Sequence, residues 1–178
     1  MKKFIIGCSL FCFIALQASA QIPTFTLSDN VLNLGVGFGG SWYPGYGLGY
    51  TGVSRTPIFS ASFEHCIIQN VWDAKSSIGA GGLIGYSSIS WKDSDWRINN
   101  IFIGGRGALH YAFVDNLDVY AGLMVGYKFV THNTDLKRSS EFAPDLFAGA
   151  RYYFAGNVSV FAEAGYWMML NMGISFKF

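Results

Sequence analysis

After residue 20, the sequence repeatedly alternates between apolar residues and polar or very small residues, with a period of two. In the last segment, one face carries Leu170, Met172, Ile174, Phe176 and Phe178, and the other carries Asn171, Gly173, Ser175 and Lys177. A period of two is the side-chain spacing of a β-strand, so each such segment predicts a strand with one apolar face. No apolar run after residue 20 reaches the roughly 20 residues that a membrane-spanning helix requires.

The alternation predicts eight strands, at about 31–39, 57–66, 76–90, 97–113, 118–131, 143–154, 158–166 and 170–178. The chain is 51% hydrophobic and only 13% charged, whereas soluble domains carry about 25% charged residues. An apolar chain without spanning helices crosses a membrane as a closed barrel. We therefore predict an all-β fold, an eight-stranded antiparallel transmembrane β-barrel with up-and-down meander topology and both termini in the periplasm.

The first twenty residues have the features of a secretory signal peptide. Lys2 and Lys3 precede an apolar segment, and Ala18-Ser19-Ala20 form a small-residue cleavage site. We expect 1–20 to be cleaved, 21–30 to be an N-terminal periplasmic segment, and 31–178 to be the barrel, located in the bacterial outer membrane. Without the two signal lysines, ten basic residues remain against eleven acidic ones. This balance gives no reason to expect nucleic acid as a partner.

The segment "LNLGVGFGG" has Gly35, Gly37 and Gly40 at the spacing of a dinucleotide-binding fingerprint. That motif requires a helix to begin at its last glycine. Here Pro44 and further glycines follow and would break a helix. We therefore expect no cofactor, and instead assign the glycines to the narrow interior of the barrel, where they leave room for larger side chains.

Charged residues share the predicted inward face with these glycines. They are Glu64, Arg106, His110, Lys128, Arg151, Glu163 and Lys177. Buried charges are tolerated when they are paired. With a turn at 155–157, Arg151 and Glu163 occupy diagonal positions of one hairpin, so we predict that they pair.

Several quoted segments also resemble a known family. They are "PIFSASFEH", "SIGAGGLIGYSS", "NIFIGGRGALHYAF", "VDNLDVYAGLMVGY", "GARYYFAGNVSVFAEAGY" and "LNMGISFKF". Together they are similar to small outer-membrane β-barrel proteins of Bacteroidota-type bacteria, a family with an outer membrane protein beta-barrel domain. The resemblance implies the fold, the location and insertion by the barrel assembly machinery, for which Phe176 and Phe178 would form the C-terminal signal. It implies no catalytic motif.

Other candidate sites each have a structural alternative. His65, Cys66 and His110 suggest a metal site, but their spacing fits neither a zinc finger nor a helix, so we expect no metal. Trp42, Tyr43, Tyr46 and Tyr50 would form either a partner-binding loop or part of an aromatic belt. We assign two girdles, with Tyr86, Tyr127, Tyr166 and Trp167 at one end and Tyr111, Phe113, Phe154 and Phe178 at the other.

These features predict a non-enzymatic, plugged barrel that contacts outer-membrane lipid and is a structural protein or an accessory subunit of a larger outer-membrane complex. One alternative is a lipid-modifying barrel enzyme, for which His132, Thr134, Ser139, Ser140 and Glu141 would supply the nucleophile, base and acid. Another alternative is a narrow pore for small solutes.

Overall fold

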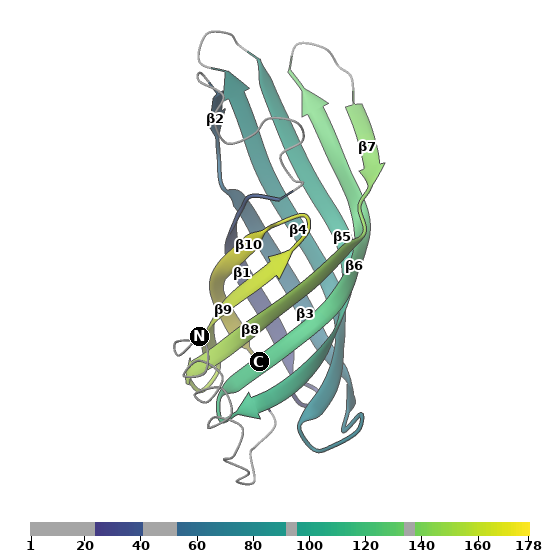
Figure 1. Ribbon diagram of the computed structural model, residues 1–178, viewed down its shortest axis with the longest axis vertical. Coiled ribbons are helices and arrows are strands. Elements are labelled where there is room, and N and C mark those ends of the chain that lie inside the picture. The colour runs from purple at the N-terminus through teal and green to yellow at the C-terminus, as the bar shows by residue number, and fades with distance from the viewer. Residues whose placement is uncertain (1–23, 41–52, 92–95, 134–137) are drawn as a thin grey trace, which may run out of the picture.

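Antiparallel strands form one sheet that closes on itself (Figure 1). The computed structural model describes residues 24–40, 53–91, 96–133 and 138–178. Its strands are β1 (Asn30–Phe38), β2 (Val53–Arg55), β3 (Ile58–Gln69), β4 (Ser76–Trp91), β5 (Arg97–Val114), β6 (Leu117–His132), β7 (Arg138–Phe142), β8 (Asp145–Ala155), β9 (Val158–Gly165) and β10 (Leu170–Lys177). Within these residues, no helix is long and apolar enough to cross a membrane.

The wall of the barrel consists of eight strands in meander order. It runs β1, β3, β4, β5, β6, β8, β9 and β10, and the pairing of β1 with β10 closes it. The two short strands extend this wall: β2 pairs with β4, and β7 pairs with β6. Pro57 separates β2 from β3, and Pro144 separates β7 from β8, as expected for a residue that cannot donate to a sheet ladder. The predicted eight-stranded antiparallel barrel is confirmed.

The two ends of the barrel differ. We call the end with the turns at 70–75, 115–116 and 156–157 the base, and the opposite end the rim. The C-terminal residue lies at the base, where the backbone N–H groups of Asn30 and Phe178 each donate to the other residue's carbonyl oxygen at 2.9 Å. At the rim, β4, β5 and β6 extend beyond β1, β9 and β10, with β2 and β7 beside them (Figure 1). The rim is therefore high on one side and low on the other.

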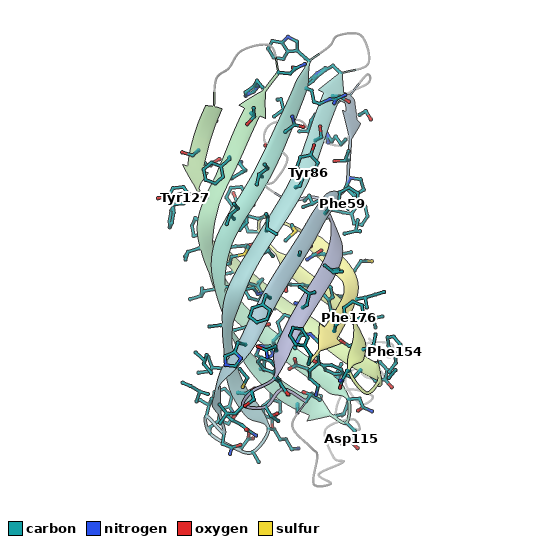
Figure 2. All side chains as sticks on the ribbon, turned by 180° about the vertical axis from the view of Figure 1, so that it is seen from behind. Phe59, Tyr86, Asp115, Tyr127, Phe154 and Phe176 are labelled. Atoms are coloured by element: carbon teal, nitrogen blue, oxygen red, sulfur yellow. The ribbon has the colours of Figure 1, made fainter. Side chains whose placement is uncertain are left out.

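The outer wall is apolar up to a boundary near the rim. Tyr86 and Tyr127 point away from the wall (Figure 2) and are 42% and 52% exposed. The Tyr86 hydroxyl donates to Asn99 Oδ1 at 3.0 Å. Nearer the rim, the outward positions become polar, at Ser88, Ser90, Arg97, Asn99 and Thr131. This change divides a membrane-compatible band from strand ends suited to water.

Candidate functional site

The inward face is the candidate site, because the charged side chains meet there. Glycine makes this possible by admitting large side chains from neighbouring strands. A Cβ atom on Gly149 would lie 2.8 Å from the Tyr120 ring, and one on Gly126 would lie 2.8 Å from the Phe102 ring. Both rings are buried. The predicted role of the inward glycines therefore agrees with the geometry.

Four charged side chains near the base form a quartet, defined here as Glu64, His110, Asp118 and Arg151. His110 Nε2 lies 3.0 Å from Glu64 Oε1, and His110 Nδ1 lies 3.0 Å from Asp118 Oδ2. Arg151 donates to Asp118 at 3.0 Å and to Glu64 at 3.4 Å. All four are buried, His110 at 1% exposure and the others at 0%. Since both ring nitrogens face carboxylate oxygens, both donate, and the imidazole is cationic. The quartet then holds two positive and two negative charges.

A second buried pair lies closer to the rim. Arg106 Nη2 donates to Glu163 Oε2 at 2.7 Å, and the Tyr120 hydroxyl donates to the same oxygen at 3.3 Å. The Arg106 guanidinium also stands 4.0 Å from the centroid of the Phe147 ring. The predicted pairing of Arg151 with Glu163 is therefore wrong. Asp118 lies directly opposite Arg151 in the register of β6 and β8 and takes its place, while Glu163 reaches across the barrel to Arg106.

The two remaining predicted charges, Lys128 and Lys177, occupy opposite ends of the interior. Near the rim, the Lys128 ammonium lies 2.9 Å from Glu141 Oε2 and 4.7 Å from the centroid of the Trp167 ring. Near the base, Lys177 Nζ donates to the Thr24 carbonyl at 3.2 Å and lies 3.8 Å from Asp29 Oδ2.

The segment 24–29 closes the base of the barrel. Phe25 is 2% exposed, clusters with Val31 and Cys66, and its ring centroid lies 4.5 Å from that of His110. Asp29 fixes the turn by accepting from the backbone N–H and the hydroxyl of Thr26 at 2.8 and 2.9 Å. The apolar ring thus covers the quartet from below. We refer to 24–29 as the N-terminal plug.

A cluster of buried apolar side chains, here called the apolar layer, begins at the level of His110 and extends toward the rim. It consists of Ile58, Leu83, Phe102, Ala108, Tyr120, Met124, Ala143, Phe147, Trp167 and Met168. Trp167 is 4% exposed, and its indole N–H donates to the Pro144 carbonyl at 2.7 Å. The assignment of Trp167 to an aromatic girdle is therefore wrong. The turn between β9 and β10 folds inward because Asp145 accepts from the backbone N–H groups of Tyr166 and Trp167 at 2.8 and 3.3 Å.

The residues considered for a metal site point in different directions. Cys66 is buried in contact with Phe25 of the N-terminal plug and Val31. His65 is exposed, and its Nδ1 lies 3.0 Å from Asn30 Oδ1. His110 is bound by carboxylates of the quartet. In the part of the chain that the structure describes, no group of three or more His, Cys, Asp or Glu residues is arranged to hold a metal ion.

The residues considered for catalysis lie at the rim. In the pairing of β6 with β7, Ser139 is opposite Val130 and Ser140 is opposite Phe129, so the two serines face opposite sides of the sheet. Ser139 shares its side with His132 and Glu141, but Glu141 is bound to Lys128. Thr134 lies outside the described residues.

The predicted partner-binding loop, with Trp42, Tyr43, Tyr46 and Tyr50, also lies outside the described residues. Phe176 and Phe178 lie on the outer face, at 40% and 65% exposure; their role as a C-terminal assembly signal stays a prediction.

Sequence reasoning missed Asp118, Tyr120 and Phe25. The alternation of the sequence could have identified the first two as inward residues, because Asp118 and Tyr120 lie on the same face of β6 as Gly122 and Lys128. Phe25 precedes the first alternating segment, and no periodic signal places it.

No protein-family model matches the chain, and no curated protein sequence matches it. Two crystal structures of Ail, the attachment invasion locus protein of Yersinia pestis, are similar to it. The structure with the heparin analogue sucrose octasulfate has a TM-score of 0.55 at 7% identity, and the other has 0.54 at 10%. Each alignment covers 86% of this chain and 100% of that chain. The N-terminal β-barrel domain of Pseudomonas aeruginosa OprF aligns over 85% of this chain and 98% of that chain, with a TM-score of 0.49 and 11% identity. The similarity to Ail shows that the fold is that of an outer-membrane β-barrel.

Proposed function

We propose that the protein is an integral β-barrel of the bacterial outer membrane that conducts no solutes and serves as a structural protein or an accessory subunit of a larger complex. The observation that carries this proposal is the filled interior. The N-terminal plug, the quartet and the Arg106–Glu163 pair follow one another from base to rim, and the apolar layer packs around the pair and extends toward the rim. An eight-stranded barrel has room for side chains but not for an aqueous channel beside them, whereas porins have 16–18 strands.

The outer wall supports the location. Its apolar band ends where the outward residues become polar, beyond Tyr86 on β4 and beyond Phe129 on β6, as in barrels exposed to lipid. With both termini in the periplasm, as expected for a barrel with an even number of strands, the base would face the periplasm and the rim the outside of the cell. The terminal Phe178 fits recognition by the barrel assembly machinery, and the resemblance of the sequence segments favours a Bacteroidota-type barrel.

The rim supports a role in binding a partner. β4, β5 and β6 extend beyond the apolar band, and the aromatic residues Trp42, Tyr43, Tyr46 and Tyr50 belong to a segment that connects two strands at this end. Aromatic residues are enriched at the centres of protein interfaces. We therefore assign partner contact to this segment.

Crosslinking in native outer membranes tests this role. Replacement of residues 42–50 by a Gly/Ser segment of equal length is expected to abolish a crosslinked partner while leaving the barrel folded. Replacement of residues 92–95, which also connect strands at the rim, is the matched control and is expected to leave the crosslink intact. If the crosslinked partner is retained after replacement of residues 42–50, the partner must contact another surface of the protein.

The non-enzymatic assignment rests on Glu141. A Ser-His-acid site needs a carboxylate that orients the histidine, but the only acid in the candidate set forms an ion pair with Lys128 at 2.9 Å. We therefore expect overexpression of the protein to leave the mass spectrum of lipid A unchanged. A new lipid A species that disappears with His132→Ala would show an enzyme instead.

A further inference from the structure

A row of polar side chains crosses neighbouring strands at the level of the quartet, from Ser62, which is nearer the rim than Glu64, to Ser159, which is nearer the base than Arg151. Asn33 on β1 is in register with Ser62 on β3 and with Ser175 on β10, and Ser175 is in register with Ser159 on β9. All four side chains point inward and are buried, with exposures of 2%, 5%, 0% and 0% for Asn33, Ser62, Ser175 and Ser159. We call these four residues the polar row.

Only one direct side-chain hydrogen bond in this row is defined. Asn33 Nδ2 donates to Ser62 Oγ at 2.8 Å. Three other buried atoms, Asn33 Oδ1, Ser175 Oγ and Ser159 Oγ, have no hydrogen-bond partner in the protein. Buried polar atoms are nearly always satisfied, by protein or by ordered water, because leaving them unpaired is unfavourable. Three such atoms at consecutive register positions therefore indicate a bound polar ligand.

The spacing of the strands identifies that ligand. Side chains in register on adjacent antiparallel strands have Cβ atoms about 4.5–5.5 Å apart. Short side chains on such a row can be linked by one water molecule that forms hydrogen bonds of about 2.8 Å on each side. We propose that ordered water molecules occupy the polar row and bridge Asn33, Ser175 and Ser159.

The charges around the row favour water over an anion. None of the four side chains is charged, and the neighbouring quartet is already balanced. The closest cation along β10 is Lys177, which lies beside Asp29 and donates to the Thr24 carbonyl. Asn33 Oδ1 accepts hydrogen bonds and would repel an anion, whereas water donates to Asn33 and can either donate to or accept from the serine hydroxyls.

These water molecules would be enclosed. All four side chains of the polar row are at most 5% exposed. Hydration of this part of the interior is therefore compatible with a barrel that does not conduct.

Water–protein NOE spectroscopy on the folded, isotope-labelled protein in nanodiscs tests the proposal. The Asn33 side-chain amide is expected to show cross-peaks to water with the sign of a long-lived contact. Asn171 is the matched control, because it is also inward and 3% exposed but its Oδ1 already accepts from Ser60 Oγ at 3.1 Å; it should show none. The absence of cross-peaks at Asn33, or equal cross-peaks at both residues, would overturn the proposal. A shift of the Asn33 resonances when bromide replaces chloride would instead show an anion site.

Substitution provides a second readout. If water completes the hydrogen bonds, Ser159→Ala and Ser175→Ala should each lower the urea midpoint of unfolding by an amount similar to Ser62→Ala, which removes a direct partner of Asn33. If the two hydroxyls are unsatisfied, their removal will leave the midpoint unchanged or raise it, and the proposal fails.

Discussion

At the scale of single residues, the buried charges of the interior are balanced by carboxylates that each form ion pairs with two cations. Glu64 and Asp118 both contact His110 and Arg151. Because each carboxylate contacts both cations, the loss of any one of the four residues changes the charge balance around the other three. Removing one member of a buried ion pair is more costly than the pair is stabilising, because an uncompensated charge stays behind.

Glu163→Gln tests the pair nearer the rim. The substitution leaves the buried Arg106 guanidinium without a counter-charge, so we expect a loss of about 3–5 kcal/mol in the free energy of unfolding. The control is Asp115→Asn, because Asp115 is exposed in the turn between β5 and β6 and surface substitutions of this kind change stability by about 0.5 kcal/mol or less. Urea titration measures both. Equal stability of the two variants would contradict the assignment of Arg106 to Glu163.

His110→Gln tests the charge balance of the quartet. The neutral side chain leaves two carboxylates with one guanidinium, and we expect a loss of about 3–5 kcal/mol. Adding Asp118→Asn removes the excess negative charge, so the double variant should be less destabilised than the sum of the two single variants, with a coupling of about 0.5–3 kcal/mol. Strict additivity in the double-mutant cycle would show that His110 is not a cation paired with Asp118.

The sequence predicted which charges face inward but not how they pair. The alternation assigns a face to every residue of a strand, and all seven predicted charges lie on the face that it assigns. Pairing across the barrel depends instead on strand tilt and register, which bring Arg106 to Glu163 although β5 and β9 are not neighbours. Arg151 and Glu163 were predicted to pair because they lie on adjacent strands of one hairpin.

At the scale of strands, the inward glycines let neighbouring strands and large rings approach closely. A Cβ atom on Gly81 would collide with the Phe63 carbonyl oxygen of β3, whereas one on Gly105, which faces outward, would have its nearest neighbour at 3.8 Å. We expect Gly81→Ala to cost about 1–3 kcal/mol through overpacking, and Gly105→Ala to fold like the wild type. The fraction of folded protein after refolding in detergent distinguishes them. Equal yields would contradict the close approach of β3 and β4.

Strand positions were predictable because they follow from local alternation, whereas the turn between β9 and β10 was not. Trp167 was expected to belong to an aromatic girdle on the outer face, since aromatic residues near strand ends usually do. The structure instead turns Trp167, together with Met168, into the interior, where the backbone N–H groups of Tyr166 and Trp167 donate to Asp145. Asp145 lies on another hairpin, so no local pattern predicts this contact.

At the scale of the whole molecule, closure of the sheet accounts for stability. The pairing of β1 with β10 leaves no free edge within the eight-stranded wall, and strands without edges resist detergent. Unheated protein is therefore expected to migrate differently from boiled protein on a denaturing gel. Identical mobility of the two samples would contradict a closed barrel.

A filled interior leaves no path for ions, so ion conductance distinguishes a plugged barrel from an open one. The purified protein in planar lipid bilayers is compared with a porin of 16–18 strands inserted in the same way. We expect no stable conductance from this protein under conditions in which the porin opens, because the N-terminal plug and the apolar layer fill the interior. Steady single-channel openings from the purified protein would contradict a plugged barrel.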